Sequence, residues 1–135
     1  MPVANMMRLL IADDSDLIVQ RLVTMLAGVD GLEIVGRAGT VPEASRAVRA
    51  LKPDVMILDL GMPGGNGIDV LEGMKRDRLT PIVIVLTNYH YPQYRARCLK
   101  SGAQFFLDKS TEFERVGAVL DGVIRQASRK PQDRQ

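Results

Sequence analysis

The sequence predicts an α/β protein built on a doubly wound, five-stranded parallel sheet. Two observations lead to this prediction. Short segments that are apolar throughout recur along the chain, as expected of strands covered by helices on both faces. Segments with the apolar spacing of amphipathic helices lie between them, so strand and helix alternate five times. That alternation is typical of parallel sheets with right-handed crossovers.

The strands are predicted from the apolar runs. Four runs contain no polar residue and are expected to form strands covered on both faces: 9–12, 55–58, 82–86 and 105–107. A fifth candidate, 32–35, contains Glu33 and is therefore expected to lie nearer an edge of the sheet.

The helices are predicted from spacing and capping residues. Apolar residues share one face of a first helix that Gly28 helps to end: Ile18, Leu22, Met25 and Leu26. Thr40 and Glu43 have the spacing of a capping box at the start of a second helix. A shorter third helix is expected over residues 67–74.

Two further helices complete the pattern. Pro92 is expected to open a fourth helix, which ends near Ser101 and Gly102. Thr111 and Glu114 repeat the capping-box spacing before a fifth helix. We expect residues 1–128 to form one domain and residues 129–135 a polar tail.

Composition limits the classes of function. With 135 residues, 46% of them hydrophobic, the chain can form one ordinary domain with a core. The net charge of +2 gives no general argument for nucleic-acid or membrane binding. Cys98 is the single cysteine, which excludes an internal disulfide and fits a reducing cytoplasm. His90 and Cys98 are interpreted as an idle loop residue and a small helix hydrophobe.

Polar residues follow the predicted strands. Asp13 and Asp14 follow the first strand, Asp59 the third, Thr87 ends the fourth, and Lys109 comes after the fifth. In a parallel sheet these positions meet at one edge, where ligands bind. Clustered carboxylates repel each other unless a cation neutralises them, and an all-oxygen set favours Mg²⁺. A carboxylate beside Mg²⁺, a lysine and a hydroxyl suits an aspartyl-phosphate nucleophile.

Four motifs resemble the response-regulator receiver domains of two-component signalling. They are IADDS at 11–15, MILDLGMPGGNG at 56–67, VLTN at 85–88 and GAQFFLDKS at 102–110. The resemblance covers nearly the whole chain. It implies the flavodoxin-like receiver topology with strand order 2-1-3-4-5.

The resemblance also implies a role for each matching residue. Asp59 resembles the phosphoacceptor, and Asp13, Asp14, Asp59 and the carbonyl of Gly61 the ligands of Mg²⁺. Thr87 resembles the switch hydroxyl, Lys109 the phosphoryl-binding lysine, and Phe106 the switch aromatic that packs inward on activation.

Some positions depart from the family pattern or tune it. Asn88 replaces the usual small residue after the switch threonine, which is expected to reduce access for small phosphodonors. Ser110 replaces a frequent cis proline, so the geometry of the Lys109–Ser110 peptide stays open. In this family the residues matching Gly61 and Tyr89 influence how long the phosphoryl group survives, and Tyr89 is expected to screen it from water.

Aromatic residues are clustered late in the chain. All three tyrosines and all three phenylalanines lie between residues 89 and 113. Core filling explains such a cluster, yet tyrosine is also favoured at interfaces. In the resembling family the fourth helix, fifth strand and fifth helix form the output face. We therefore expect Tyr91 and Tyr94 to contact a protein partner or a second copy of the chain.

The resemblance implies a sensor histidine kinase, or a histidine phosphotransfer protein in a phosphorelay, as the phosphodonor. A stand-alone receiver is favoured because the chain begins with methionine and ends in a polar tail. The alternatives are a phosphate relay, the receiver half of a truncated DNA-binding regulator, and a non-phosphorylated pseudo-receiver that acts through protein contacts. Nucleic acid is a partner only if a further effector domain exists. A haloacid-dehalogenase-type phosphatase is disfavoured because DLGM lacks the second aspartate, and a flavodoxin because no phosphate loop follows the first strand.

Overall fold

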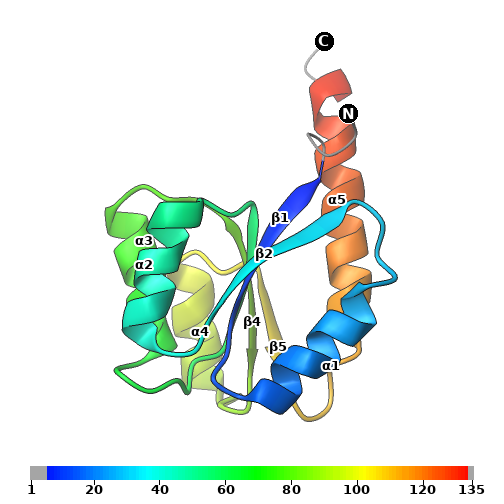
Figure 1. Cartoon of the computed structure of the whole chain (residues 1–135). Coiled ribbons are helices and arrows are strands. Elements are labelled where there is room, and N and C mark those ends of the chain that lie inside the picture. Colours follow the sequence, from blue (N-terminus) through cyan, green and yellow to red (C-terminus); the bar gives the residue numbers. More distant parts are fainter. Residues whose placement is uncertain (1–5, 134–135) are drawn as a thin grey trace.

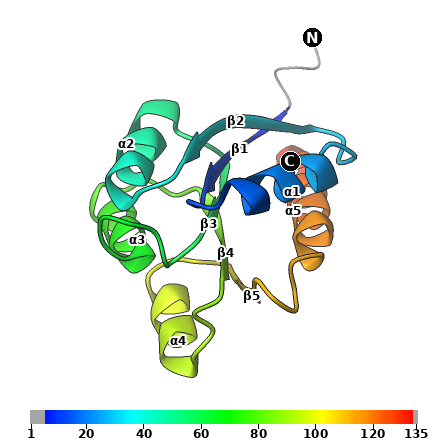
Figure 2. The same cartoon turned by 60° about the horizontal axis from the view of Figure 1, so that its bottom comes forward.

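Five parallel strands form the centre of the protein in the order β2-β1-β3-β4-β5, with helices on both faces (Figures 1 and 2). The computed structural model describes the backbone of residues 6–133 and the side chains of residues 6–127. The strands are β1 (Met7–Ala12), β2 (Leu32–Ala38), β3 (Val55–Leu58), β4 (Ile82–Thr87) and β5 (Phe105–Asp108). The predicted fold class and strand order are therefore confirmed.

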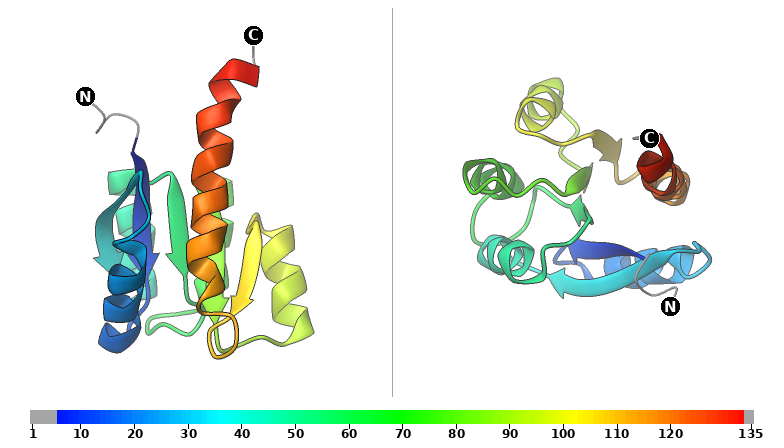
Figure 3. Two further views of the ribbon diagram at one scale, coloured as in Figure 1. Left: turned by 90° about the vertical axis from the view of Figure 1, so that its right-hand side faces the viewer. Right: turned by 90° about the horizontal axis from the view of Figure 1, so that it is seen from above.

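The helices divide between the two faces (Figure 3). They are α1 (Asp16–Leu26), α2 (Val41–Leu51), α3 (Gly67–Arg76), α4 (Pro92–Lys100) and α5 (Arg115–Asp133). Helices α1 and α5 pack on one face through residues such as Leu22 and Leu120. Helices α2, α3 and α4 cover the other through residues such as Val48, Leu71 and Cys98. The sheet is thus buried on both sides, which accounts for the uninterrupted apolar runs of β3 and β4.

The edge position of β2 explains its mixed composition. Glu33 is exposed, as expected for an edge strand, but β2 extends to Ala38, beyond the predicted 32–35. Its pairing with β1 shifts register between Leu9 and Leu10, so Val35 of β2 has no partner residue on β1.

The capping predictions have different outcomes. Thr40 caps α2 through its side chain, which accepts a hydrogen bond from the Glu43 N–H at 3.2 Å, while the Glu43 carboxylate accepts from Gly39 rather than Thr40. Helix α1 ends at Leu26 with Ala27 in a right-handed conformation, so its end does not use a left-handed glycine.

Helix α5 differs from the prediction at both ends. It begins at Arg115, so Thr111 and Glu114 do not form the predicted box at its first turn. It also continues to Asp133, through most of the segment predicted as a polar tail. Residues 134 and 135 of that segment lie outside the described residues. The division into a domain over 1–128 and a tail over 129–135 stays a prediction.

Candidate functional site

The carboxyl ends of the strands bring the predicted site residues to one edge of the sheet, at the bottom of Figure 1. The backbone hydrogen bonds between neighbouring strands continue one residue past the strand ends. The Asp13 N–H donates to the Ala38 carbonyl at 2.9 Å, and the Asp59 N–H to the Ala12 carbonyl at 2.9 Å. The Lys109 N–H donates to the Thr87 carbonyl at 2.9 Å. Rigid, hydrogen-bonded backbone therefore aims these side chains.

Lys109 joins the two buried carboxylates. Its Nζ lies 2.8 Å from Asp13 Oδ2 and 3.0 Å from Asp59 Oδ2. The Lys109 side chain is 10% exposed, and Asp13 and Asp59 are 1% and 6% exposed. Burial is the largest single influence on the pKa of Lys109 and lowers it, but the close contacts of its ammonium with the negatively charged Asp13 and Asp59 carboxylates together outweigh burial and raise the pKa. Lys109 therefore stays charged at neutral pH.

Local hydrogen bonds hold each carboxylate in place. Asp13 Oδ1 accepts from the Ser15 N–H at 2.9 Å, and Asp59 Oδ1 accepts from the Gly61 N–H at 3.2 Å. In each case the second oxygen points to Lys109. Asp13 Oδ2, although close to the ammonium, lacks a well-directed hydrogen bond among the described residues. This buried oxygen retains lone pairs that a cation or water can use.

The acidic residues fit a hard divalent cation. Asp13, Asp14 and Asp59 each offer a carboxylate oxygen, and these atoms all lie within 4.8 Å of one another. Opposite ligands of an octahedral Mg²⁺ lie ~4.2 Å apart, twice the metal–oxygen distance, so a small contraction would bring the three oxygens onto one ion. One lysine offsets only part of the charge of three carboxylates. The exposed Asp14 leaves one side of the cluster open to solvent.

Thr87 and Phe106 lie inside the fold, on neighbouring strands. Thr87 is 0% exposed, and its Oγ1 accepts a hydrogen bond from the Tyr89 N–H at 3.1 Å. Phe106 is 7% exposed and packs in the apolar cluster on the α4 side of the sheet. The two predicted switch residues are therefore both buried, but Thr87 makes a hydrogen bond to the backbone whereas Phe106 packs among apolar side chains.

The two positions that depart from the family pattern contact each other. Ser110 Oγ donates to Asn88 Oδ1 at 3.0 Å, so the Asn88 side chain is held toward the loop between β5 and α5. No cis peptide bond occurs in the described part of the chain, so Lys109–Ser110 is trans. The side chains of Asn88 and Ser110 thus tie two loops at the mouth of the site.

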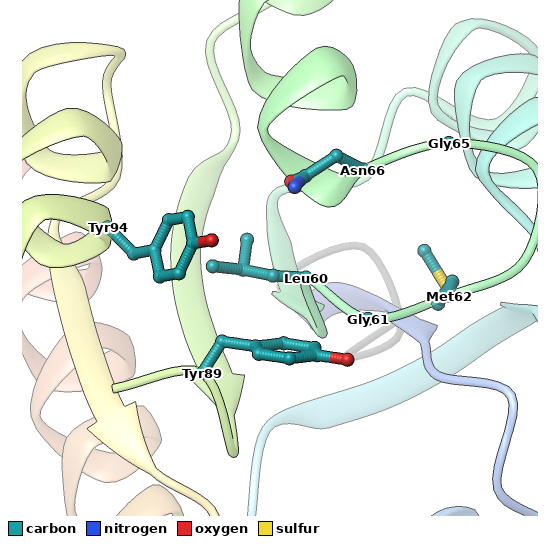
Figure 4. Close-up of a pocket in the computed structure, with 7 residues that line it drawn as sticks. All are labelled: Leu60, Gly61, Met62, Gly65, Asn66, Tyr89 and Tyr94. Atoms are coloured by element: carbon teal, nitrogen blue, oxygen red, sulfur yellow. The ribbon is translucent and has the colours of Figure 1, made fainter. Parts of the chain in front are cut away.

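Tyr89 lies across Gly61. A methyl group placed on Gly61 would come within 2.3 Å of Tyr89 Cε2, so the ring rests directly on the glycine. Beside this contact is a cavity of about 340 Å³, which Figure 4 shows between the β3–α3 loop and α4. Its lining residues are Leu60, Gly61, Met62, Gly65, Asn66, Tyr89 and Tyr94.

The predicted output tyrosines differ in exposure. Tyr91 is 57% exposed, whereas Tyr94 is half-buried and packs against the apolar cluster beneath α4. Their rings meet edge to face with centroids 6.0 Å apart. Only Tyr91 therefore presents most of its side chain to a partner.

Sequence reasoning missed two residues at this edge. Asn66 caps α3 in a capping box with Asp69 and lines the cavity beside Tyr89, and the three-residue spacing of Asn66 and Asp69 was the available signal. His90, interpreted as idle, has its Nδ1 2.9 Å from the Asn88 carbonyl and 3.4 Å from Asp108 Oδ2. Nothing in the sequence indicated these contacts.

Known proteins are similar to this chain in sequence. The sequence model of the response regulator receiver domain matches residues 9–121. Response regulator GacA of Pseudomonas viridiflava is 35% identical over 104 residues, which cover 77% of this chain and 49% of GacA. The chain spans about half the length of the curated relatives it matches.

Solved structures share the fold. The response regulator domain of Thermotoga maritima CheB is 29% identical with a TM-score of 0.78, and the match covers 90% of this chain and 96% of that domain. A CheX–CheY–BeF₃–Mg²⁺ complex from Borrelia burgdorferi is 25% identical with a TM-score of 0.72, over 89% of this chain and 98% of the matched one. Within the described residues, no helix has the length and apolar character needed to cross a membrane.

Proposed function

The chain belongs to the response regulator receiver domains of two-component systems, and from this premise we propose that Asp59 is its phosphoacceptor. The observation that carries the proposal is the position of Lys109. Its ammonium contacts Asp13 and Asp59 at once, from a strand end far away in sequence. A buried cation at the acceptor carboxylate is placed to hold a phosphoryl oxygen.

The transfer forms one bond and breaks one. An Asp59 carboxylate oxygen attacks the phosphorus of a phosphohistidine, the oxygen–phosphorus bond forms, and the phosphorus–nitrogen bond breaks to release imidazole. Asp13, Asp14, Asp59 and the Gly61 carbonyl would hold Mg²⁺, which supplies positive charge that balances the phosphoryl oxygens when bound. The chain thereby assists its own phosphorylation.

Thr87 is the proposed switch. A phosphoryl oxygen on Asp59 would draw the Thr87 hydroxyl away from the Tyr89 N–H. Shifting a two-state equilibrium from 1:99 to 99:1 takes ~5.5 kcal/mol, and charge-assisted hydrogen bonds contribute ~1.5–3 kcal/mol each. Because Phe106 is already buried, its proposed change is a repacking on the α4 side rather than entry from solvent.

The phosphodonor is proposed to be a histidine kinase or a histidine phosphotransfer protein. A groove leads to Lys109 from outside. A cavity of about 420 Å³ lined by Lys109 and Asn88 shares Arg21, Phe113 and Glu114 with a neighbouring apolar cavity of about 550 Å³. The second cavity includes Leu17, which is 65% exposed. An apolar surface beside the acceptor suits a docking protein better than a small phosphodonor.

Tyr91 and Tyr94 are proposed to belong to the output surface formed by α4, β5 and α5, which contacts a downstream protein or a second copy. The support is the exposure of Tyr91 and its stacking on His90, with ring centroids 6.0 Å apart. Truncation of both tyrosines to alanine should weaken binding of an identified partner. Unchanged binding would remove this part of the proposal.

Tyr89 is also proposed to lengthen the life of the phosphoryl group. Its ring rests on Gly61, directly after the acceptor segment, where it limits the approach of water. A Tyr89→Ala chain should lose the phosphoryl group faster than the parent. Equal rates of loss would exclude the screening role.

Intact mass after incubation with acetyl phosphate and Mg²⁺ tests the function. The expected result is one phosphoryl increment that is lost in Asp59→Asn and in the metal-free control. If the parent shows no increment, an Asn88→Ala chain separates two explanations. An increment in that variant would mean that Asn88 blocks small donors, and none would contradict the acceptor role of Asp59.

A second candidate, the receiver half of a DNA-binding regulator, is favoured by the greater length of the relatives, which include the transcriptional regulatory protein DesR of Bacillus subtilis. The size of the protein in its native cells tests it. An immunoblot band near twice the 14.9 kDa of this chain would support a longer regulator. A band at the mass of the chain would contradict it.

A further inference from the structure

Tyr89 touches the acceptor loop through its ring. The ring lies on Gly61, close enough that an added methyl group would stand 2.3 Å from Cε2 and 3.2 Å from Cδ2. The N–H of the same glycine donates to Asp59 Oδ1 at 3.2 Å. A phosphoryl group on Asp59 changes the charge and the bulk that this N–H and its carbonyl face. The surface beneath the Tyr89 ring is therefore sensitive to the state of Asp59.

Tyr89 is tied to the proposed switch through its backbone as well. Its N–H donates to Thr87 Oγ1 at 3.1 Å. A hydroxyl that turns toward a phosphoryl oxygen no longer accepts this hydrogen bond with the same geometry. One event at Asp59 thus acts on Tyr89 from two sides.

The ring of Tyr89 also contacts α4. It meets Tyr94 edge to face, with centroids 6.3 Å apart and planes inclined by 71°. Tyr94 packs in turn on the cluster that contains Phe106. Such aromatic pairs depend on orientation and contribute ~0.5–1.5 kcal/mol beyond buried area, so a shift of one ring changes the preferred position of the other.

The surroundings leave the ring free to move. Tyr89 is 49% exposed, and its ring and the Tyr94 side chain both line the cavity of about 340 Å³ (Figure 4). A shift therefore requires no rearrangement of the closely packed core.

We propose that Tyr89 relays the state of Asp59 to α4: phosphorylation displaces its ring from Gly61 and alters its packing against Tyr94. The relay rests on the proposed phosphoacceptor function and adds to it a second route to α4, through Tyr89, beside the one through Phe106. Tyr89 acts here as a positioning residue, since its effect on the output face passes through Tyr94.

Tyrosine fluorescence provides a selective measurement. The chain has no tryptophan, and its three tyrosines are Tyr89, Tyr91 and Tyr94. A Tyr91→Phe/Tyr94→Phe chain keeps the rings but emits only from Tyr89. A Tyr89→Phe/Tyr91→Phe chain emits only from Tyr94. Both emissions are expected to change on addition of acetyl phosphate and Mg²⁺, and neither in an Asp59→Asn background.

The decisive variant removes the ring of Tyr89. In a Tyr89→Ala/Tyr91→Phe chain, the emission change of Tyr94 per phosphorylated molecule, with the phosphorylated fraction of each sample taken from its intact mass, should be smaller than in the Tyr89→Phe/Tyr91→Phe chain. The matched control, Tyr89→Phe/Tyr91→Ala, truncates the neighbouring tyrosine off the route and should keep the change. If circular dichroism shows that the Tyr89→Ala chain is unfolded, Tyr89→Leu is used in its place. Leucine keeps much of the bulk without the aromatic ring and should give the same reduction of the Tyr94 response.

The outcomes separate the two proposals. An unaltered Tyr94 response in the Tyr89→Ala and Tyr89→Leu chains, compared at equal phosphorylated fraction, overturns the relay alone. A parent chain and an Asn88→Ala chain that both gain no mass overturn the acceptor function, and the relay with it. The relay is also overturned if the emission of the Tyr91→Phe/Tyr94→Phe chain, in which Tyr89 is the one remaining tyrosine, does not change on full phosphorylation.

Discussion

Lys109 contacts two of the carboxylates that are proposed to bind Mg²⁺, so we expect it to compete with the ion for them. Replacement by methionine would free Asp13 Oδ2 and Asp59 Oδ2, which lie 2.8 and 3.0 Å from its ammonium. We predict that Lys109→Met binds Mg²⁺ ~10-fold more tightly, equivalent to ~1.4 kcal/mol, while acetyl phosphate modifies it more slowly.

The dependence of the melting temperature on Mg²⁺ concentration measures this affinity, because a ligand that binds only the folded state stabilises it. Asp13→Asn is the matched control and should weaken Mg²⁺ binding. Equal affinities in parent and Lys109→Met would show that the lysine does not share oxygens with the metal.

Cys98 makes stability depend on alkaline pH. Burial raises the pKa of its thiol from the ordinary 9.0 to about 11, although the charge of Arg97 opposes the change. At pH 7 the thiol is neutral in both the folded and the unfolded state. Between pH 9 and 11 the unfolded chain ionises first, so stability falls as the pH rises, by ~2 kcal/mol at pH 10.5.

Urea unfolding at pH 8 and pH 10.5 measures this loss, with Cys98→Ala as the reference for all other titrations. The parent should lose ~2 kcal/mol more than the variant between the two pH values. Parallel losses would mean that the thiol ionises equally in the folded state.

At the level of single residues, the sequence predicted which side chains lie near one another but not which contacts they make. Asp13, Asp59 and Lys109 each follow a strand, and parallel pairing places such residues together whatever their side chains do. The bond between Asn88 and Ser110 and the contact of Tyr89 with Gly61 depend on side-chain rotamers and loop paths. No periodicity in the sequence encodes those.

Two glycines after β3 have different constraints: Gly61 lies in the loop between β3 and α3, and Gly67 is the first residue of α3. A methyl group on Gly67 would lie 2.7 Å from the Asp59 carbonyl oxygen and 2.8 Å from Leu60 Cα, both backbone atoms. On Gly61 it would meet only the half-exposed Tyr89 ring, which can swing away. We predict that Gly67→Ala destabilises by ~2–3 kcal/mol and Gly61→Ala by less than ~1 kcal/mol.

Denaturant midpoints of the two variants test this difference. Gly67→Ala should also lower phosphorylation, because relief of the clash must move the backbone of the acceptor itself. Similar destabilisation by both substitutions would contradict the distinction between backbone and side-chain contacts.

Among the elements, strands were predicted more reliably than helix starts. An apolar run follows directly from the burial of a strand, whereas the spacing of a capping box shows only that two side chains could cap a helix there. Before α5 that option is not used, because the Glu112 carboxylate accepts the Asp108 N–H at 2.9 Å, a bond that lowers the pKa of Glu112. Asp108 in turn accepts from the Ser110 N–H at 2.8 Å. These bonds close a turn that delays the helix to Arg115.

For the whole molecule, the groove between α1 and the β5–α5 loop should distinguish protein donors from small ones. Leu17, which is exposed, lines the outer cavity but not the cavity that contains Lys109. We predict that Leu17→Asp slows transfer from a histidine kinase at least ~10-fold and leaves modification by acetyl phosphate unchanged, since a charge disrupts an apolar contact only where a protein docks.

The transfer rate from a kinase selected for activity on the parent chain measures this effect. Val23→Asp is the matched control, because Val23 is 44% exposed on the same helix and does not line the groove. An equal effect of both substitutions would argue against docking through this groove.

The start of β1 and the end of α5 both point to the end of the sheet opposite the carboxyl ends of the strands, at the top of Figure 1. This arrangement follows from helices that run antiparallel to the strands. A protein tethered to a sensor chip or a bead through either end would therefore present the acceptor to solution. A domain fused at either end would begin on the far side of the sheet from the proposed acceptor. A conformational change at Asp59 could then reach that domain only through the helices and loops of this one, and not by direct contact.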